Sequence, residues 1–145
     1  MSDETNTIFT SEQISQQAQG NVNSLCLVMV AYLKEHDLSQ DGFWSFVGRQ
    51  IAPGWEQGAS AKDVALGAAL NMISGGWEMR SFSGDESQAQ AVLGGGLSED
   101  SLEFFGLTQG EADSVWAVFG PIAESLGYEY EWHRQGDEIK MSFSR

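Results

Sequence analysis

The stretch YEYEWHRQGDEIKMSF, residues 128–143, decides the fold. Aromatic residues alternate with charged residues before Gly136, and apolar residues alternate with polar residues after Asp137. An alternation with a period of two is typical of half-buried β-strands, and a Gly-Asp pair between two such segments predicts a tight hairpin. A turn at Gln135-Gly136 would shift the pairing by two residues and keep the same faces. With Gly136-Asp137 as the turn, the facing apolar pairs are Trp132 with Met141 and Tyr130 with Phe143.

A second, weaker hairpin is predicted upstream, in WEMRSFSGDESQAQAVL, residues 77–93. Trp77 and Met79 alternate with Glu78 and Arg80, which indicates a strand with one apolar face. Gly84-Asp85 can form the turn, and residues 88–93 can return as a short, alanine-rich strand. The two hairpins together predict a three- or four-stranded antiparallel sheet, with a helical segment of the chain between the two hairpins.

The segment before this sheet is expected to be helical. Thr10 and Gln13 have the spacing of a capping box at the start of a first helix. From Val22 to Leu33 almost every residue is apolar, so this part of the helix is expected to be buried all round. Gly20-Asn21 marks a point where the helix can bend or break. Serine or aspartate caps predict two further helices, over about residues 40–52 and 61–74.

Between the hairpins, two more helices are predicted. Ser98 can begin a short helix, and Thr108 with Glu111 forms a second capping box. The helix after Thr108 contains Gly120-Pro121 and is expected to kink there. The predicted fold class is therefore α+β, with four or five helices packed on one face of the antiparallel sheet.

Length and composition predict one domain over residues 10–145, after a disordered tail over residues 1–9. The chain has 145 residues, a net charge of −14 and one cysteine, Cys26. A surface this acidic repels phosphate backbones and anionic membranes, so we expect no nucleic-acid partner and no membrane partner. A lone cysteine and the absence of a signal peptide favour the cytoplasm. Expected protein partners are a second copy of the chain or a basic protein.

One candidate site uses the charged face of the sheet. His133 next to Glu131 could act as a general base, because a carboxylate orients an imidazole and raises its pKa. Arg80 could hold a substrate carboxylate by two parallel hydrogen bonds, with Glu78 beside it. The alternative interpretation of these residues is a solvated sheet face with cross-strand ion pairs.

A second candidate site is an apolar pocket between helices and sheet. The chain is rich in aromatic residues, with five Trp, eight Phe and three Tyr, and these can line a pocket or fill a core. Cys26 lies in an apolar run and is expected to be a packed core thiol. No metal site is predicted, because Glu131 and His133 supply only two ligands, and no cofactor can be assigned. The candidate ligand contacts are Phe43, Trp44, Trp77, Arg80, Tyr130 and Trp132.

The order of elements over residues 60–145 resembles that of a group of small α+β domains. The resemblance lies in GWEMRSFSGDESQAQAVL (76–93), EFFGLTQGEADSVWAVFGPIAESLGY (103–128) and the terminal hairpin. In this layout the chain is similar to the 2-amino-thiazoline-carboxylate hydrolase-like and 4-vinyl reductase-like families. Those families often carry cysteines in the final hairpin, where this chain has Trp132, His133 and Ser142. The resemblance implies a small-molecule-binding domain used in sensing or cofactor pathways, and it transfers no catalytic residue.

The function that these observations favour is a cytoplasmic domain that binds a small, partly apolar ligand in an aromatic-lined pocket. One alternative is a small hydrolase that uses His133 and Glu131. The other is a non-catalytic interaction module whose acidic surface binds a basic protein.

Overall fold

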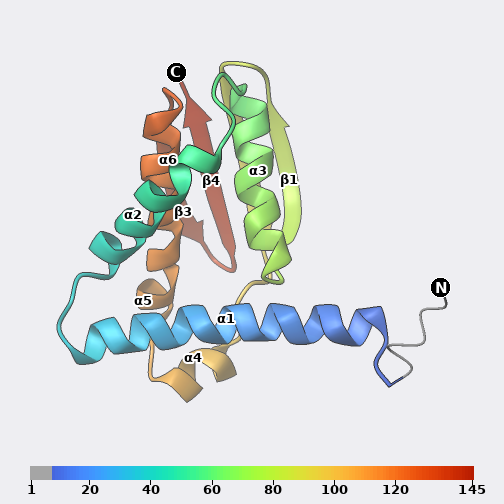
Figure 1. Cartoon of the computed structure of the whole chain (residues 1–145), viewed down its shortest axis with the longest axis vertical. Coiled ribbons are helices and arrows are strands. Elements are labelled where there is room, and N and C mark those ends of the chain that lie inside the picture. The colour runs from blue at the N-terminus through green and yellow to red at the C-terminus, as the bar shows by residue number, and fades with distance from the viewer. Residues whose placement is uncertain (1–7) are drawn as a thin grey trace.

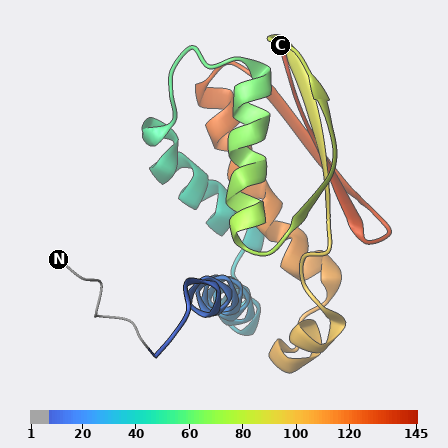
Figure 2. The same cartoon turned by 90° about the vertical axis from the view of Figure 1, so that its right-hand side faces the viewer.

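The computed structural model describes residues 8–145 and has an α+β fold (Figure 1). Helices cover one face of a four-stranded antiparallel sheet and leave the other face open (Figure 2). The predicted fold class is confirmed. The α-helices are α1 (Ser11–Glu35), α2 (Gln40–Ile51), α3 (Ala61–Ser74), α4 (Glu99–Phe105), α5 (Gln109–Asp113) and α6 (Phe119–Ser125). The strands are β1 (Glu78–Gly84), β2 (Gln88–Gly94), β3 (Glu129–Gln135) and β4 (Glu138–Ser144), and two short 3-10 helices are η2 (Ala52–Gly54) and η3 (Ser114–Val118).

The terminal hairpin has the predicted register. Gln135 pairs with Glu138, so Gly136 and Asp137 are the turn residues, and Gly136 has the positive φ of 62° that this tight turn requires. Trp132 faces Met141 and Tyr130 faces Phe143. The sheet order is β1-β2-β4-β3, so the two hairpins are joined through the antiparallel pairing of β2 with β4. β1 and β3 are therefore the two edges of the sheet.

The upstream hairpin departs from the predicted alternation. The register of β1 against β2 shifts between Met79 and Ser81, which is a β-bulge. Met79 pairs with buried Leu93 and so lies on the covered face, where it is 36% exposed at the edge of the sheet, and Trp77 just before the strand is buried. The shift comes after Met79, so Phe82 and not Ser81 is the next side chain on the covered face. An extra residue in one strand changes which side chains face the core, and simple alternation does not reveal it.

The core lies between the covered face of the sheet and helices α3 and α6. Small side chains bring α3 close to β2, because Ala65 and Ala68 on the helix and Ala89 and Ala91 on the strand are all buried. The alanine-rich composition of β2 therefore reflects close packing against α3. The larger side chains of the core are Leu93, Trp116, Ile122, Ile139, Met141 and Phe143.

The segment predicted as one kinked helix after Thr108 consists of three pieces. Thr108 and Glu111 form the predicted capping box of α5. After α5 the chain forms the 3-10 helix η3, and α6 begins at Phe119. Pro121 lies in the first turn of α6 and has no N–H to donate to the carbonyl four residues earlier, so α-helical hydrogen bonding cannot run unbroken from η3 into α6. The change of helix type comes before Gly120-Pro121, not at a kink within a continuous helix.

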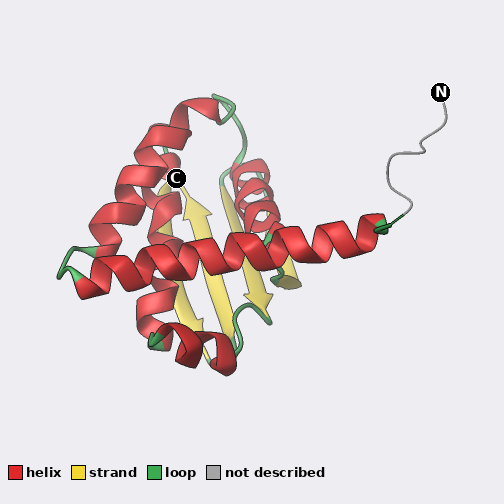
Figure 3. Cartoon of the chain, turned by 60° about the horizontal axis from the view of Figure 1, so that its bottom comes forward, coloured by secondary structure: helices red, strands yellow, loops and turns green. Residues whose placement is uncertain are grey.

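Helix α1 also differs from expectation. It is continuous from Ser11 to Glu35, without a break at Gly20-Asn21, and its capping box at Thr10 is formed as predicted. Its first turns extend past the rest of the fold (Figure 3). The expectation that its apolar part is buried all round is wrong, because α1 lies across the end of the helical layer and meets protein on one side only. Its buried residues are Leu27, Val30 and Leu33, and Val22, Leu25, Val28 and Tyr32 are 48–60% exposed.

Candidate functional site: a pocket beneath helix α1

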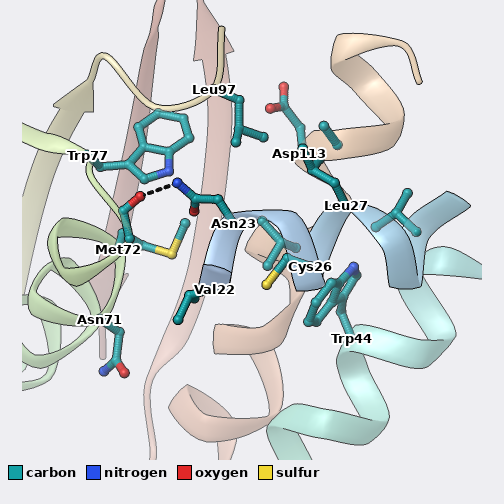
Figure 4. A pocket seen from close by; sticks show the side chains of 14 residues that line it. Val22, Asn23, Cys26, Leu27, Trp44, Asn71, Met72, Trp77, Leu97 and Asp113 are labelled. Atoms are coloured by element: carbon teal, nitrogen blue, oxygen red, sulfur yellow. Dashed lines mark hydrogen bonds between the residues drawn. The ribbon is translucent and has the colours of Figure 1, made fainter. Parts of the chain in front are cut away.

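A largely apolar pocket of about 120 Å³ lies beneath α1 (Figure 4). α1 forms its cover, the end of α3 and Trp77 form one wall, and α2 and α5 contribute the other. Trp77 and Trp44 lie at opposite ends, with the sulfur atoms of Met72 and Cys26 between them. Engineered apolar cavities of about 150 Å³ stay dry and bind benzene, so a space of this size suits a single small ring. The lining residues are Val22, Asn23, Cys26, Leu27, Val30, Trp44, Asn71, Met72, Gly75, Trp77, Leu97, Ala112, Asp113 and Val115.

The two tryptophans are held by different contacts. The buried indole N–H of Trp44 donates a hydrogen bond of 3.1 Å to the Ser114 hydroxyl, and the ring of Phe43 packs edge-on against it. Trp77 packs edge-to-face on Trp116, with ring centroids 5.1 Å apart. Space behind Trp77 is also filled, because a Cβ atom at Gly96 would lie 2.5 Å from its ring. Both walls are therefore positioned by the fold before any ligand arrives.

The cover is tied down at two points. The side-chain amide of Asn23 donates to the carbonyl of Gly75 at the end of α3, next to the pocket. At the other end of α1, the Lys34 ammonium donates to the Gly106 carbonyl at 2.9 Å and to the Glu111 carboxylate at 3.0 Å. Val22 and Asn71 line the pocket and are themselves exposed, so the pocket reaches the surface between α1 and α3.

One charged side chain, Asp113, lines the pocket, and its charge is balanced by Arg134. Asp113 is 4% exposed and accepts two hydrogen bonds from the guanidinium of Arg134 and one from Gln109. The hydrogen bonds to Asp113 raise the pKa of Arg134, so the guanidinium stays charged over the ordinary pH range. Because the two charges cancel, the pocket has no net charge to attract an ion. Sequence reasoning missed Asp113, although an acidic residue in an otherwise buried helical turn was a usable signal.

Cys26 is a pocket residue and not a fully packed core thiol. It is half-buried and lines the space between the two tryptophans. Burial raises the pKa of its thiol, so the neutral, weakly nucleophilic form predominates near pH 7. The chemistry of this position is therefore that of a small apolar side chain.

The structure brings together two of the six predicted ligand contacts. Trp44 and Trp77 line the pocket, and Phe43 supports Trp44 from outside. Tyr130 is partly buried against the core, where its hydroxyl donates to the Trp116 carbonyl at 2.8 Å and burial raises its pKa. Tyr130 does not line the pocket. It packs on Phe119, which packs on Trp116, and Trp116 packs on the pocket residue Trp77.

Trp132 and Arg80 lie elsewhere. Trp132 is half-buried on the edge strand β3 opposite Met141. Arg80 is on the opposite edge strand, exposed, and lies 3.7 Å from both Glu78 and Asp137. It is therefore occupied with surface ion pairs on the open side of the molecule.

The proposed hydrolase residues are both exposed on the open face. His133 is paired in the sheet with Lys140, and Glu131 with Ser142. Glu78 and Arg80 do not join them, because β1 and β3 are separated by two strands, or roughly 14 Å at the usual strand spacing. The hydrolase hypothesis stays a prediction.

Comparisons with known proteins do not assign the chain to a family. The sequence matches no protein-family model, and no curated protein matches it significantly. Within residues 8–145, no helix is long and apolar enough to cross a membrane. In the same part of the chain, no three His, Cys, Asp or Glu side chains converge as they would around a metal ion.

Proposed function

We propose that the protein binds a small, uncharged and mainly apolar molecule in the pocket beneath α1. The observation that carries this proposal is the pocket itself: about 120 Å³ of space between Trp44 and Trp77, with a lining dominated by apolar side chains. A folded chain normally fills such space, because an apolar void forfeits dispersion contacts on every side. A ligand would restore those contacts.

The chemistry of the lining selects the class of ligand. Two indole faces and two sulfur atoms favour a flat, polarisable ring, since aromatic and sulfur–aromatic contacts add to simple burial. The Asp113–Arg134 pair is internally balanced and gives no preference for an anion or a cation. Asp113 has accepting capacity beyond its three observed bonds, so one N–H or O–H group on the ring could be recognised.

Helix α1 supplies the route of entry in this proposal. The pocket reaches solvent beside Val22, and the nearest tie across that opening is the single Asn23–Gly75 hydrogen bond. Breaking one hydrogen bond costs about 1 kcal/mol net, which is small enough for frequent opening. The packed tryptophans on the other side would remain in place.

A thermal-shift series tests the proposal with benzene, toluene and indole as neutral probes and benzoate as the charged probe. The wild-type melting temperature is expected to rise with the neutral rings and to stay unchanged with benzoate. Cys26→Phe places a ring in the pocket and should abolish the response, while Cys26→Ala should keep it. No stabilisation by any neutral ring, or an equal response in Cys26→Phe, would overturn the proposal.

The similarity to small-molecule-binding α+β domains points in the same direction and stays a prediction. The cytoplasmic location and the acidic-interaction alternative also stay predictions.

A further inference from the structure

Helix α1 carries a second apolar face, which points away from the fold. On its inner side, Leu27, Val30 and Leu33 pack on the helical layer. About 150° around the helix, at 100° per residue, a second row of apolar side chains is exposed. The large exposed members and their accessible fractions are Ile14 47%, Leu25 60%, Val28 48% and Tyr32 57%.

The row has the spacing of a coiled-coil seam. Ala18, Leu25 and Tyr32 recur every seven residues, as do Ile14, Asn21 and Val28, which stand four residues before them. This is the a and d pattern of a heptad repeat, in which a helix packs against another helix. Asn21 is the one polar member, and Gln17 donates a hydrogen bond of 2.8 Å to its side-chain oxygen.

The charge distribution identifies what the face can meet. The chain has a net charge of −14, yet no Asp, Glu, Lys, Arg or His occurs between residues 13 and 33. A basic partner would lose the hydration of its cations against this face and gain no ion pair in return. The complementary surface must be apolar and uncharged over a length of about 30 Å, which is the same row on a second copy.

The pattern also fixes the direction of pairing. When two such helices pack antiparallel, each a residue of one helix faces a d residue of the other. For α1 this pairing means that the residue numbers of two facing residues add up to 46. Ile14 then faces Tyr32 of the other copy, Ala18 faces Val28 and Asn21 faces Leu25. All six layers are filled symmetrically, as a twofold interface requires.

Antiparallel pairing also suits the shape and charge of the molecule. The first turns of α1 extend beyond the rest of the fold (Figure 3), so each free half can cover the supported half of the other helix. The two acidic bodies then lie at opposite ends and on opposite sides of the helix pair, which keeps their repulsion small. A parallel pair would place both bodies at the same end.

We infer that the chain forms a twofold homodimer through an antiparallel pair of α1 helices, with facing positions that sum to 46. An interface one helix wide is at the low end of the usual size range, so the dimer is concentration-dependent. The interface lies on the outer side of α1 and does not depend on whether the pocket binds a ligand.

Sedimentation of the full chain over a range of concentrations tests the inference. The mass should rise from 15.8 kDa toward twice that value, and Leu25→Glu should weaken association at least tenfold. Leu70→Glu is the matched control, because Leu70 is 67% exposed on α3 and should leave association unchanged. A monomer at every concentration, or association that survives Leu25→Glu, would overturn the inference.

Cysteine cross-linking tests the direction of pairing in a Cys26→Ala background. Ile14→Cys combined with Tyr32→Cys should give a covalent dimer on mild oxidation, and Ile14→Cys alone should not. A dimer from Ile14→Cys alone would indicate parallel pairing and would contradict the assigned register.

Discussion

The terminal hairpin and the second half of α1 are similarly rich in apolar residues, but the fold treats them differently. In the hairpin, Ile139, Met141 and Phe143 are at most 1% exposed. In α1, Leu25 and Tyr32 are more than half exposed, and the buried side of the helix covers a pocket. The apolar face of the hairpin is therefore buried by other parts of the same chain. The apolar surface of α1 exceeds what the chain itself buries. We have proposed a small ligand beneath its inner side and a second copy of α1 against its outer side.

The largest expected effect comes from a matched pair of leucines, one on β2 beside the terminal hairpin and one on α1. Leu93→Ala removes a fully buried side chain from β2 and should lower the free energy of unfolding by about 2–5 kcal/mol. Leu25→Ala on exposed α1 should change it by less than about 0.5 kcal/mol in dilute protein. Urea denaturation of both variants measures the difference. Equal losses would mean that α1 belongs to the same packed core.

A matched pair of helical glycines should give the next largest effect. A Cβ atom at Gly48 in α2 would lie 2.2 Å from the Val118 carbonyl oxygen, whereas at Gly20 in α1 it would meet nothing within 4 Å. Gly48→Ala should therefore destabilise the fold by about 1–3 kcal/mol. Gly20→Ala should stabilise it by up to about 1 kcal/mol, because alanine favours the helix. Melting temperatures that move in the same direction would contradict the comparison.

The hydrogen bond between α1 and the end of α3 should have a smaller effect. Asn23→Ala removes the hydrogen bond from α1 to the Gly75 carbonyl and should cost about 1 kcal/mol. Amide hydrogen exchange should quicken in α1 and stay unchanged in β2 and β4. Asn71→Ala is the control, since its side chain bonds only to Gly67 within α3. Faster exchange throughout the sheet after Asn23→Ala would show that α1 does not open separately.

The smallest effect is a pH dependence at the far end of α1. The hydrogen bond from the Thr108 N–H lowers the pKa of Glu111, and Lys34 adds to the effect. A carboxyl group with a lowered pKa stabilises the folded state above its unfolded pKa, near 4.5, and this stability is lost as the pH falls through the lowered value. Between pH 6 and pH 3, Glu111→Gln should lose less stability than the wild type. Parallel pH profiles for the two proteins would contradict this role.

Local sequence signals predicted the hairpin because its determinants are local. Alternation and the Gly136 turn together specify which residues face each other. A different register would move the apolar side chains to the solvent face, so distant contacts do not change this pairing. The same holds for the caps at Thr10 and Thr108, where each cap joins residues three positions apart.

The burial of α1 and the make-up of the pocket depend on distant neighbours instead. The apolar run after Val22 indicates a helix with something to bury, but only the position of α1 at the end of the helical layer decides which side is covered. The Asp113–Arg134 pair joins two elements across 21 positions, and neither residue stands out beside the other in the sequence. Aromatic content suggested five of the six predicted contacts, and only tertiary packing separates Trp44 and Trp77 from the other rings.

In the proposed function, α1 covers a ligand pocket walled by Trp44 and Trp77. The most direct test is a toluene titration followed by NMR of the five tryptophan indole N–H resonances. We expect saturable shifts at Trp44 and Trp77, a smaller shift at Trp116 behind Trp77, and none at Trp55 or Trp132. Unchanged resonances at the highest soluble toluene concentration, or equal shifts at all five tryptophans, would contradict it.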